Sequence, residues 1–292
     1  MGKFEVPEID YTRYTNRQLA AVPLAVLAFA LCILAGGYVV YGTPVALGMD
    51  FAGGTELQIE TTDSEADIEA AFSEEPESVQ AVQAADNQYL VQFPPTEDDM
   101  AEQAESNLAP VDEDEGVVLQ SAETSASFGE GAQQTALLGL GAAFAGMSIL
   151  AFVLFRSFIP SIAIVASAFS DLVIPLAFMN IANIPLSLGT VAGLLLIIGY
   201  SVDSDILLNN HILRRGGDFY ESTHRAMQTG VTMTVTSMAA MLVMAISAWI
   251  FGVELLMSIG LILFVGLAAD LMNTYMLNLS LLRWYKFEGI AR

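Results

Sequence analysis

Apolar runs long enough to cross a lipid bilayer constrain this sequence more than any other feature. A transmembrane helix needs about 20 predominantly apolar residues. Six runs approach or exceed that length and cover residues 19–41, 131–155, 161–179, 186–209, 226–253 and 255–282. Together with a hydrophobic content of 54%, they predict an α-helical membrane protein with six transmembrane helices.

A strongly acidic segment separates the first two runs. Residues 43–134 contain 22 Asp and Glu and no Lys or Arg, and the whole chain has a net charge of −23. This sign excludes nucleic acid as a partner, because nucleic-acid binding requires basic side chains. It is typical of a protein kept soluble in strong salt, where repulsion between its charges is screened. The acidic faces are either solvated surfaces adapted to salt or sites for cations or a basic partner.

The pattern within the acidic segment predicts a small α+β domain. Strands are expected at 55–61, 78–85, 88–93 and 116–122, and helices at 64–72 and 96–108. Asp86 and Asn87 supply a hairpin turn between the middle strands, and Thr96 and Glu97 begin the second helix after two prolines. The order βαββαβ is that of the ferredoxin-like unit, so we expect an external ferredoxin-like domain over 43–132.

The positions of the basic residues predict the orientation in the membrane. All ten Lys and Arg lie in the N-terminal tail, the turn at Arg156, the loop 214–225 or the C-terminal tail. Six spans place these four segments on one side, which the positive-inside rule makes cytoplasmic. We therefore expect a cytoplasmic tail (1–18), a first helix (19–42), the external domain (43–132), a five-helix bundle (133–282) and a second cytoplasmic tail (283–292).

The fourth run carries carboxylates where a membrane helix rarely tolerates them. The stretch 198–211 reads IGYSVDSDILLNNH and contains Asp203 and Asp205. A charged side chain at the centre of a bilayer helix costs about 3 kcal/mol, and such residues usually mark an ion or substrate path. The alternative is that both carboxylates sit near the helix end and contact water. We take them as candidates for a proton relay.

Helical geometry separates these two acids. At 100° per residue they lie about 160° apart, so they cannot share one proton. Asp203 shares its face with Gly199 and Asn210, whereas Asp205 shares its face with Ser201 and Asn209. Two further acids, Asp171 in the third run and Asp270 in the sixth, could approach either one as relay members. They could equally form hydrogen bonds that hold the helices together.

Other chemistries find no support in the sequence. The stretch 48–57, GMDFAGGTEL, is not a phosphate loop, because it lacks a lysine and precedes a strand. The single cysteine, Cys32, and the two histidines show no metal-ligand spacing. We therefore expect no cofactor, no metal and no enzymatic activity. An intramembrane aspartyl protease using Asp171 and Asp203 is an alternative whose usual motifs are absent.

Two motifs in this arrangement resemble a known family. The first follows the first apolar run and comprises Gly48, Asp50, Phe51, Gly53 and Gly54. The second lies in the fourth run and comprises Gly199, Tyr200, Ser201 and Ser204 beside the aspartates. With the acidic domain between them and six spans in all, nearly the whole chain resembles the SecF branch of the SecD/SecF family, in the resistance-nodulation-division superfamily.

The resemblance implies a function and a set of partners. It implies an auxiliary subunit of the Sec protein-export machinery in the plasma membrane, acting with SecD, the Sec translocon channel and translocating polypeptides, and using the proton gradient. It places the proton site at Asp203, where SecD carries an aspartate; bacterial SecF carries its own at the position of Ser204. The acidity implies a haloarchaeal member. The alternative is a proton-driven exporter of small solutes or lipids from the same superfamily.

Overall fold

The computed structural model describes residues 9–83, 85–112, 116–214 and 218–289. The outer parts of the two predicted tails and the centre of the predicted basic loop, including Gly216 and Gly217, lie outside the described residues.

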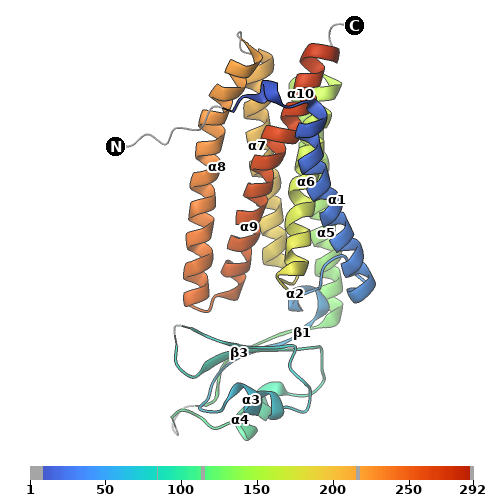
Figure 1. Ribbon diagram of the computed structural model, residues 1–292. Helices are drawn as coiled ribbons and strands as arrows, with labels where there is room; N and C mark the ends of the chain where they lie inside the picture. Colours follow the sequence, from blue (N-terminus) through green and yellow to red (C-terminus); the bar gives the residue numbers. More distant parts are fainter. Residues whose placement is uncertain (1–8, 84, 113–115, 215–217, 290–292) are drawn as a thin grey trace, which may run out of the picture.

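Long helices lying side by side form most of the molecule, and a small α+β part lies beyond one end of them (Figure 1). Six are long and apolar enough to cross a membrane, which confirms the predicted helical membrane architecture. They are α1 (Asn16–Tyr41), α5 (Ala126–Phe155), α6 (Phe158–Ile181), α7 (Leu188–Arg214), α8 (Phe219–Ile250) and a sixth that begins as α9 (Glu254–Met272). This last helix continues through η2 (Asn273–Asn278), α10 (Leu279–Trp284) and η3 (Tyr285–Gly289).

Capping residues explain why several helices extend beyond the apolar runs. Thr15 and Gln18 form a capping box at the start of α1, and Gly42 ends it in the left-handed conformation, with φ 73°. The side chain of Ser125 accepts a hydrogen bond from the Phe128 N–H, so α5 begins at Ala126, with only Ser125 between it and the end of β4. Polar groups at these ends satisfy backbone groups that the helix leaves unpaired.

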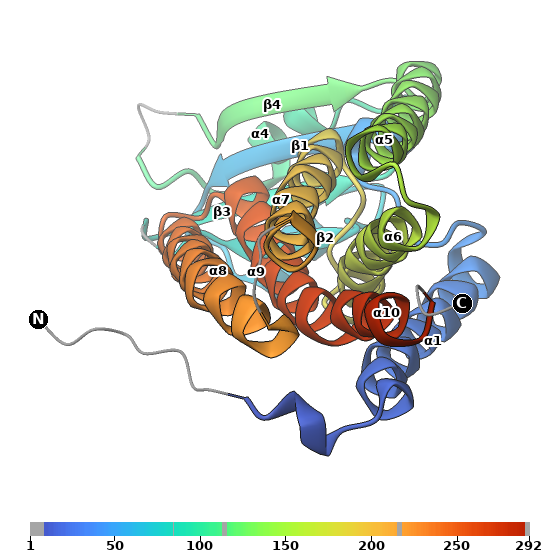
Figure 2. The ribbon, with the colours of Figure 1, turned by 90° about the horizontal axis from the view of Figure 1, so that it is seen from above.

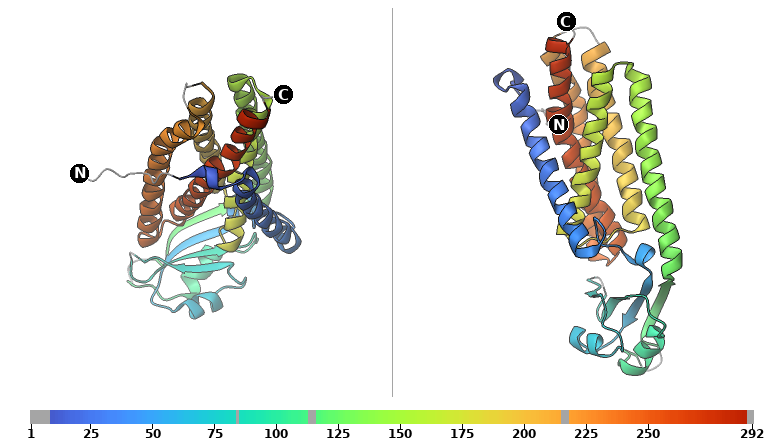
Figure 3. Two further views of the ribbon diagram at one scale, coloured as in Figure 1. Left: turned by 45° about the horizontal axis from the view of Figure 1, so that its top comes forward. Right: turned by 90° about the vertical axis from the view of Figure 1, so that its right-hand side faces the viewer.

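Within the bundle, α7 is the central helix of one face. Viewed along the bundle, it lies between α5 and α8, with α6 and α9 beside it (Figure 2). The side view shows that the connections to the α+β part run from the ends of α1 and α5 (Figure 3). The bundle core is apolar and includes Leu172, Leu194, Ile197 and Ile262.

The α+β part contains a four-stranded sheet and two short helices. The strands are β1 (Gly54–Glu60), β2 (Ser78–Ala81), β3 (Gln88–Phe93) and β4 (Val118–Thr124), and the helices are α3 (Glu65–Ala70) and α4 (Met100–Asn107). The strand order is β2-β3-β1-β4, and every neighbouring pair is antiparallel. The predicted start of the second helix at Thr96 is wrong, because the Asp99 side chain caps α4 by accepting from the Glu102 N–H.

The two faces of the sheet have different chemistry. One face is apolar, with Leu57, Ile59, Val91 and Phe93 fully or almost fully buried against α3 and α4. Strand alternation places polar side chains on the other face, which is turned toward the helix bundle (Figure 1). There Gln92 Nε2 donates to Glu56 at 2.8 Å, and Gln80 Nε2 donates to Glu254 at the start of α9 at 3.2 Å. The sheet therefore meets the bundle through polar contacts, across a cleft of about 450 Å³.

A short extended segment, residues 46–48, connects the α+β part to the loop between α6 and α7 by hydrogen bonds. The Gly48 N–H donates to Leu186 O at 2.8 Å, and the Leu186 N–H donates back to Ala46 O at 2.8 Å. This segment leads into the one-turn helix α2 (Met49–Ala52), which is followed by Gly53 and Gly54 with φ of 83° and 136°. These positive values explain the two glycines, since residues with a Cβ rarely adopt them.

Candidate functional site: a buried carboxylate network

Three carboxylates from three different helices converge within the bundle. Asp171 belongs to α6, Asp205 to α7 and Asp270 to α9, and their exposed fractions are 0%, 0% and 1%. All three are candidates that the sequence identified. The structure brings them together through hydroxyl and amide side chains of α7 and η2.

Each carboxylate accepts hydrogen bonds from side chains of another helix. Asp171 accepts from Ser201 Oγ at 2.5 Å and from Asn273 Nδ2 at 2.6 Å. Asp270 accepts from Ser204 Oγ at 2.7 Å. The predicted motif residues Ser201 and Ser204 thus connect α7 to α6 and α9.

Asp205 is held by the sixth helix. Its Oδ1 atom accepts from Thr274 Oγ1 at 2.9 Å and from Asn278 Nδ2 at 2.7 Å. Thr274 Oγ1 also lies 3.3 Å from Asp270 Oδ1. Because a hydroxyl has one proton, Thr274 can donate to only one of the two carboxylates at a time. A single hydroxyl therefore separates Asp205 from Asp270.

The π-helical turn η2 supplies the donors Thr274 and Asn278. In an α-helix, residues five apart point about 140° away from each other. A π-turn widens the helix so that the backbone bonds from i to i+5, which brings such residues toward one face. Asn273 and Asn278 are five apart, and both amides reach carboxylates of the network. Sequence reasoning missed Asn273, Thr274 and Asn278; their signal is three polar residues within an apolar run, just after Asp270.

The electrostatics of the network favour binding of a proton. Among the described residues, its hydrogen-bond partners are hydroxyls and amides, and the two ion pairs lie at exposed positions outside it. Buried like charges this close repel strongly, so the three carboxylates cannot all be charged without a cation. Asp205 Oδ2 and Asp270 Oδ2 are buried and have no hydrogen-bond partner in the described part of the chain. Across that same part, no three His, Cys, Asp or Glu side chains are grouped closely enough to hold a metal ion.

Asp203 lies outside this network. Its side chain is exposed on the outer face of α7, in line with exposed Gly199 one turn before it. Tyr200, on the neighbouring position, donates to Thr234 of α8 at 3.4 Å. Asn209 follows Asp205 on the buried face and accepts from Asn278 Nδ2 at 3.2 Å.

The first motif lies at the N-terminal end of α7. Asp50 Oδ2 accepts from the Leu188 N–H, the first residue of α7, at 2.9 Å. Phe51 is buried. Its carbonyl oxygen packs so closely against Gly129 of α5 that a Cβ added to Gly129 would lie only 2.6 Å from this oxygen. The two motifs are thus connected through α7.

Comparison with known proteins assigns the family. A family model described as protein export membrane protein SecD/SecF, C-terminal, matches residues 103–288. The protein-export membrane protein SecF of Haloferax volcanii is 61% identical over the full length of both chains. The chain belongs to the SecF family. The Haloquadratum walsbyi SecF, 59% identical over the full length of both chains, agrees, and these relatives confirm the predicted resemblance and its haloarchaeal character.

The fold is also that of a solved membrane protein, SecDF. The crystal structure of SecDF, a translocon-associated membrane protein from Thermus thermophilus, matches 98% of this chain with a TM-score of 0.69 at 23% identity. A second structure, SecDF in a super-membrane-facing form, matches with a TM-score of 0.60 at 24% identity. The chain spans 40% of the length of the SecDF chain. At this identity the match establishes the shared fold.

Proposed function

We propose that this SecF-family chain is an auxiliary subunit of the Sec protein-export machinery and that its buried carboxylate network carries the ion that drives export. The family assignment supports the role in protein export. The network supports the ion path, because three almost fully buried carboxylates joined by hydroxyls can load and release a small cation. The proposed ion is the proton, supplied by the proton gradient.

The same proposal includes the partners. SecD is the proposed partner within the membrane. The SecDF chain is longer than this one, and this chain corresponds to only 40% of the length of SecDF. The Sec translocon channel and the translocating polypeptide are the proposed partners outside the bundle. We assign the α+β part a ferredoxin-like fold because its order βαββαβ and its strand order β2-β3-β1-β4 are those of that unit.

Within the network we assign the principal ion-carrying role to Asp205. The resemblance favoured Asp203, but Asp203 is exposed on the outer face of α7. Asp205 is fully buried and is joined to Asp270 through Thr274. An ionised group in this position is costly unless a cation is bound, which is the property that an ion-carrying site needs.

The connection from the network to the α+β part runs through α7. Asp205 lies on α7, and Asp50 caps the first residue of the same helix. A change in the charge of the network that shifts α7 would move the segment 44–50 and the sheet that follows it. This is the proposed route by which ion movement repositions the α+β part.

The test compares two isosteric variants in cells that lack the native gene. Asp205→Asn keeps the size of the side chain and cannot ionise, so we expect it to abolish gradient-dependent export of a secreted reporter. Asp203→Asn, at matched membrane levels, should retain most export. The reverse result would return the ion-carrying role to Asp203, and normal export from both variants would remove that role from α7.

A further inference from the structure

A groove lies at the ends of the helices opposite the α+β part. It has a volume of about 760 Å³ and lies between the starts of α1 and α8 and the end of the sixth helix. Its walls include two arginines, three aromatic rings and an amide: Arg17, Arg283, Tyr220, Trp284, Phe287 and Asn16. The ion path described above does not use it.

The groove concentrates positive charge in a chain that has little. The chain contains 33 acids and 10 bases, yet two arginines line this one groove. The ion pairs found in the described residues, Arg13 with Asp10 and Arg225 with Glu221, involve neither of them. One acid, the exposed Glu288, also lines the groove, so its side chains carry a net charge of about +1.

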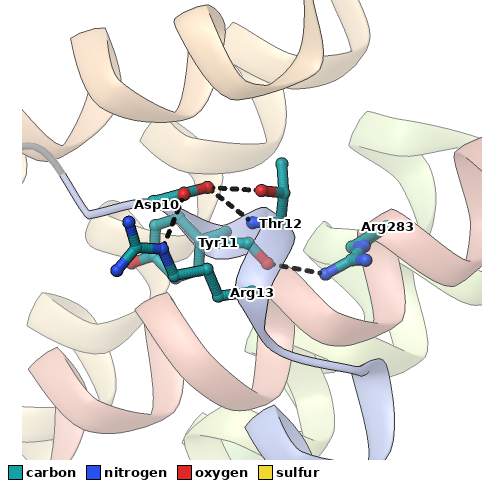
Figure 4. Close-up of polar contacts among 5 residues, drawn as sticks. All are labelled: Asp10, Tyr11, Thr12, Arg13 and Arg283. Carbon is teal, nitrogen blue, oxygen red and sulfur yellow. Dashed lines mark hydrogen bonds and ion pairs between the residues drawn. The ribbon is translucent and has the colours of Figure 1, made fainter.

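The N-terminal segment, residues 9–15, holds Arg283 in place. Arg283 Nη1 donates to the backbone oxygen of Tyr11 at 3.0 Å and to that of Tyr14 at 2.8 Å, and Figure 4 shows the first of these contacts. Its guanidinium carbon also lies 5.9 Å from the centre of the Tyr220 ring. These contacts use only one of the two terminal nitrogens. The remaining donors of a planar guanidinium suit a phosphate oxygen.

The aromatic residues place the groove at the level of lipid headgroups. Trp284 and Phe287 are 42% and 51% exposed, at the end of a helix that crosses the membrane. Trp and Tyr gather where the bilayer meets water, because one part of the ring system is apolar and another is polar. Arg17 lies in the first turn of α1, where helical N–H groups also favour an anion.

We infer that this groove binds the headgroup of an anionic phospholipid. The two arginines contact the phosphate, and the exposed rings of Trp284 and Phe287 lie against the apolar part of the lipid. A net charge of about +1 matches the single charge of a phosphodiester better than the higher charge of inorganic phosphate at neutral pH. Because Arg283 also holds the N-terminal segment, the bound lipid stabilises the position of that segment beside α10.

Trp284 provides a direct probe of this site. The chain has two tryptophans, and Trp249 lies at the end of α8 near the α+β part, so Trp249→Phe leaves Trp284 as the single tryptophan. The full-length protein is reconstituted in vesicles of phosphatidylcholine and phosphatidylglycerol, with either lipid brominated in turn, at one salt concentration. We expect brominated phosphatidylglycerol to quench Trp284 more strongly than brominated phosphatidylcholine at equal mole fraction.

Two variants in the same background separate the groove from general surface charge. Arg17 is exposed, and Arg17→Gln should reduce the preference for phosphatidylglycerol by about fivefold. If the original preference is less than about fivefold, the variant should show no preference. Arg225→Gln removes an exposed charge from α8 that is paired with Glu221 and should leave the preference unchanged. Equal quenching by both lipids, or the same preference after Arg17→Gln, would overturn the inference. Loss of the preference on adding millimolar inorganic phosphate at constant ionic strength would assign the groove to a soluble anion.

Discussion

Thr274 is the residue on which the connection between Asp205 and Asp270 depends. Its hydroxyl lies 2.9 Å from one carboxylate and 3.3 Å from the other. Thr274→Val keeps the shape and removes the hydroxyl, which costs about 2 kcal/mol for a hydrogen bond to a charged group. We expect gradient-dependent export of a secreted reporter to fall by at least tenfold, while Thr274→Ser retains most of it.

A matched control for this variant is available on α8. The hydroxyl of Thr236 donates to the Thr232 backbone oxygen within the same helix, and both residues are exposed. Thr236→Val should therefore leave export at the wild-type rate. Wild-type export from Thr274→Val would show that the bridging hydroxyl is not required.

Sequence reasoning predicted part of this site at the level of single residues. The 100° rule correctly grouped Asp205 with Ser201 and Asn209, and all three are buried. It could not choose between the two faces of α7, because the choice depends on which neighbouring helices cover each face. The donors Thr274 and Asn278 escaped detection because a π-turn changes which positions share a face, and nothing in the sequence alone marks the turn.

Tyr11 predicts a pH dependence for the docking of the N-terminal segment. Its hydroxyl lies 3.4 Å from Met227 Sδ, and burial raises the pKa of Tyr11 to about 12 from the ordinary value of 10.0. Below pH 10 the ring is neutral whether the segment is docked or released. Between about pH 10 and 12 only the released form ionises, so docking should weaken as the pH rises.

A spin label on this segment measures the effect. Ile9 is exposed, and Ile9→Cys in a Cys32→Ala background accepts a nitroxide without disturbing the Tyr11 contact. Label mobility should increase between about pH 10 and 12 in this protein and should stay constant over that window in Tyr11→Phe. Tyr14→Phe, at an exposed ring, should retain the original profile. An identical rise in mobility in Tyr11→Phe would contradict the assignment.

At the scale of elements, the start of α7 depends on a residue far away in the chain. Ser187 and Thr190 exchange hydrogen bonds at this helix end, and Asp50 accepts from the Leu188 N–H. Removing a cap of this kind costs about 1 kcal/mol. Asp50→Ala should therefore increase hydrogen exchange in the first turn of α7 and reduce export, whereas Asp50→Asn should preserve most of both properties.

The control for this prediction removes a cap elsewhere. Asp67 forms the capping box of α3 with Ser64, within the α+β part. Asp67→Ala should loosen α3 and leave the exchange of α7 unchanged. Two results would show that Asp50 has no special connection to α7. One is faster hydrogen exchange of α7 in Asp67→Ala, and the other is an unchanged exchange rate of α7 in Asp50→Ala.

The elements themselves were largely predictable, because each follows from a local pattern. The six spans follow from length and hydrophobicity, and β1 and β3 follow from alternation, with β3 matching its predicted bounds 88–93. The contacts between elements were not predictable. The pairing of Gly48 with Leu186 and the polar contact of Gln80 with Glu254 join residues more than 130 positions apart, and no periodicity encodes them.

At the scale of the whole molecule, the distribution of bases predicts the orientation. All ten bases fall in segments that six spans place on one side, and the acidic segment falls on the other. Ser73 in the α+β part and Glu288 near the C-terminus are both exposed. Each is replaced by cysteine in a Cys32→Ala background, and an impermeant maleimide should label only position 73 in intact cells. Labelling of position 288 alone would invert the orientation.

The charge of the α+β part predicts that its stability depends on salt. Its sequence from β1 to β4, residues 54–124, carries 20 acids and no bases, and its apolar core is limited to one face of a four-stranded sheet. The Debye length is about 3 Å at 1 M salt and about 30 Å at 0.01 M, so at low salt repulsion acts across most of this part. The bundle packs mainly through apolar side chains and lacks this density of charge.

Hydrogen exchange of the full-length protein in detergent measures both regions in one sample. Lowering the salt from 3 M to about 0.01 M should remove the protection of amides in β1 and β3 while those in α6 and α9 remain protected. Replacing the exposed Glu69, Glu74 and Glu75 with Gln should shift the loss of protection to lower salt, because fewer charges then repel. Equal protection of the sheet at both salt concentrations would mean that its one-sided core outweighs the repulsion, and that the acidic composition serves solubility alone.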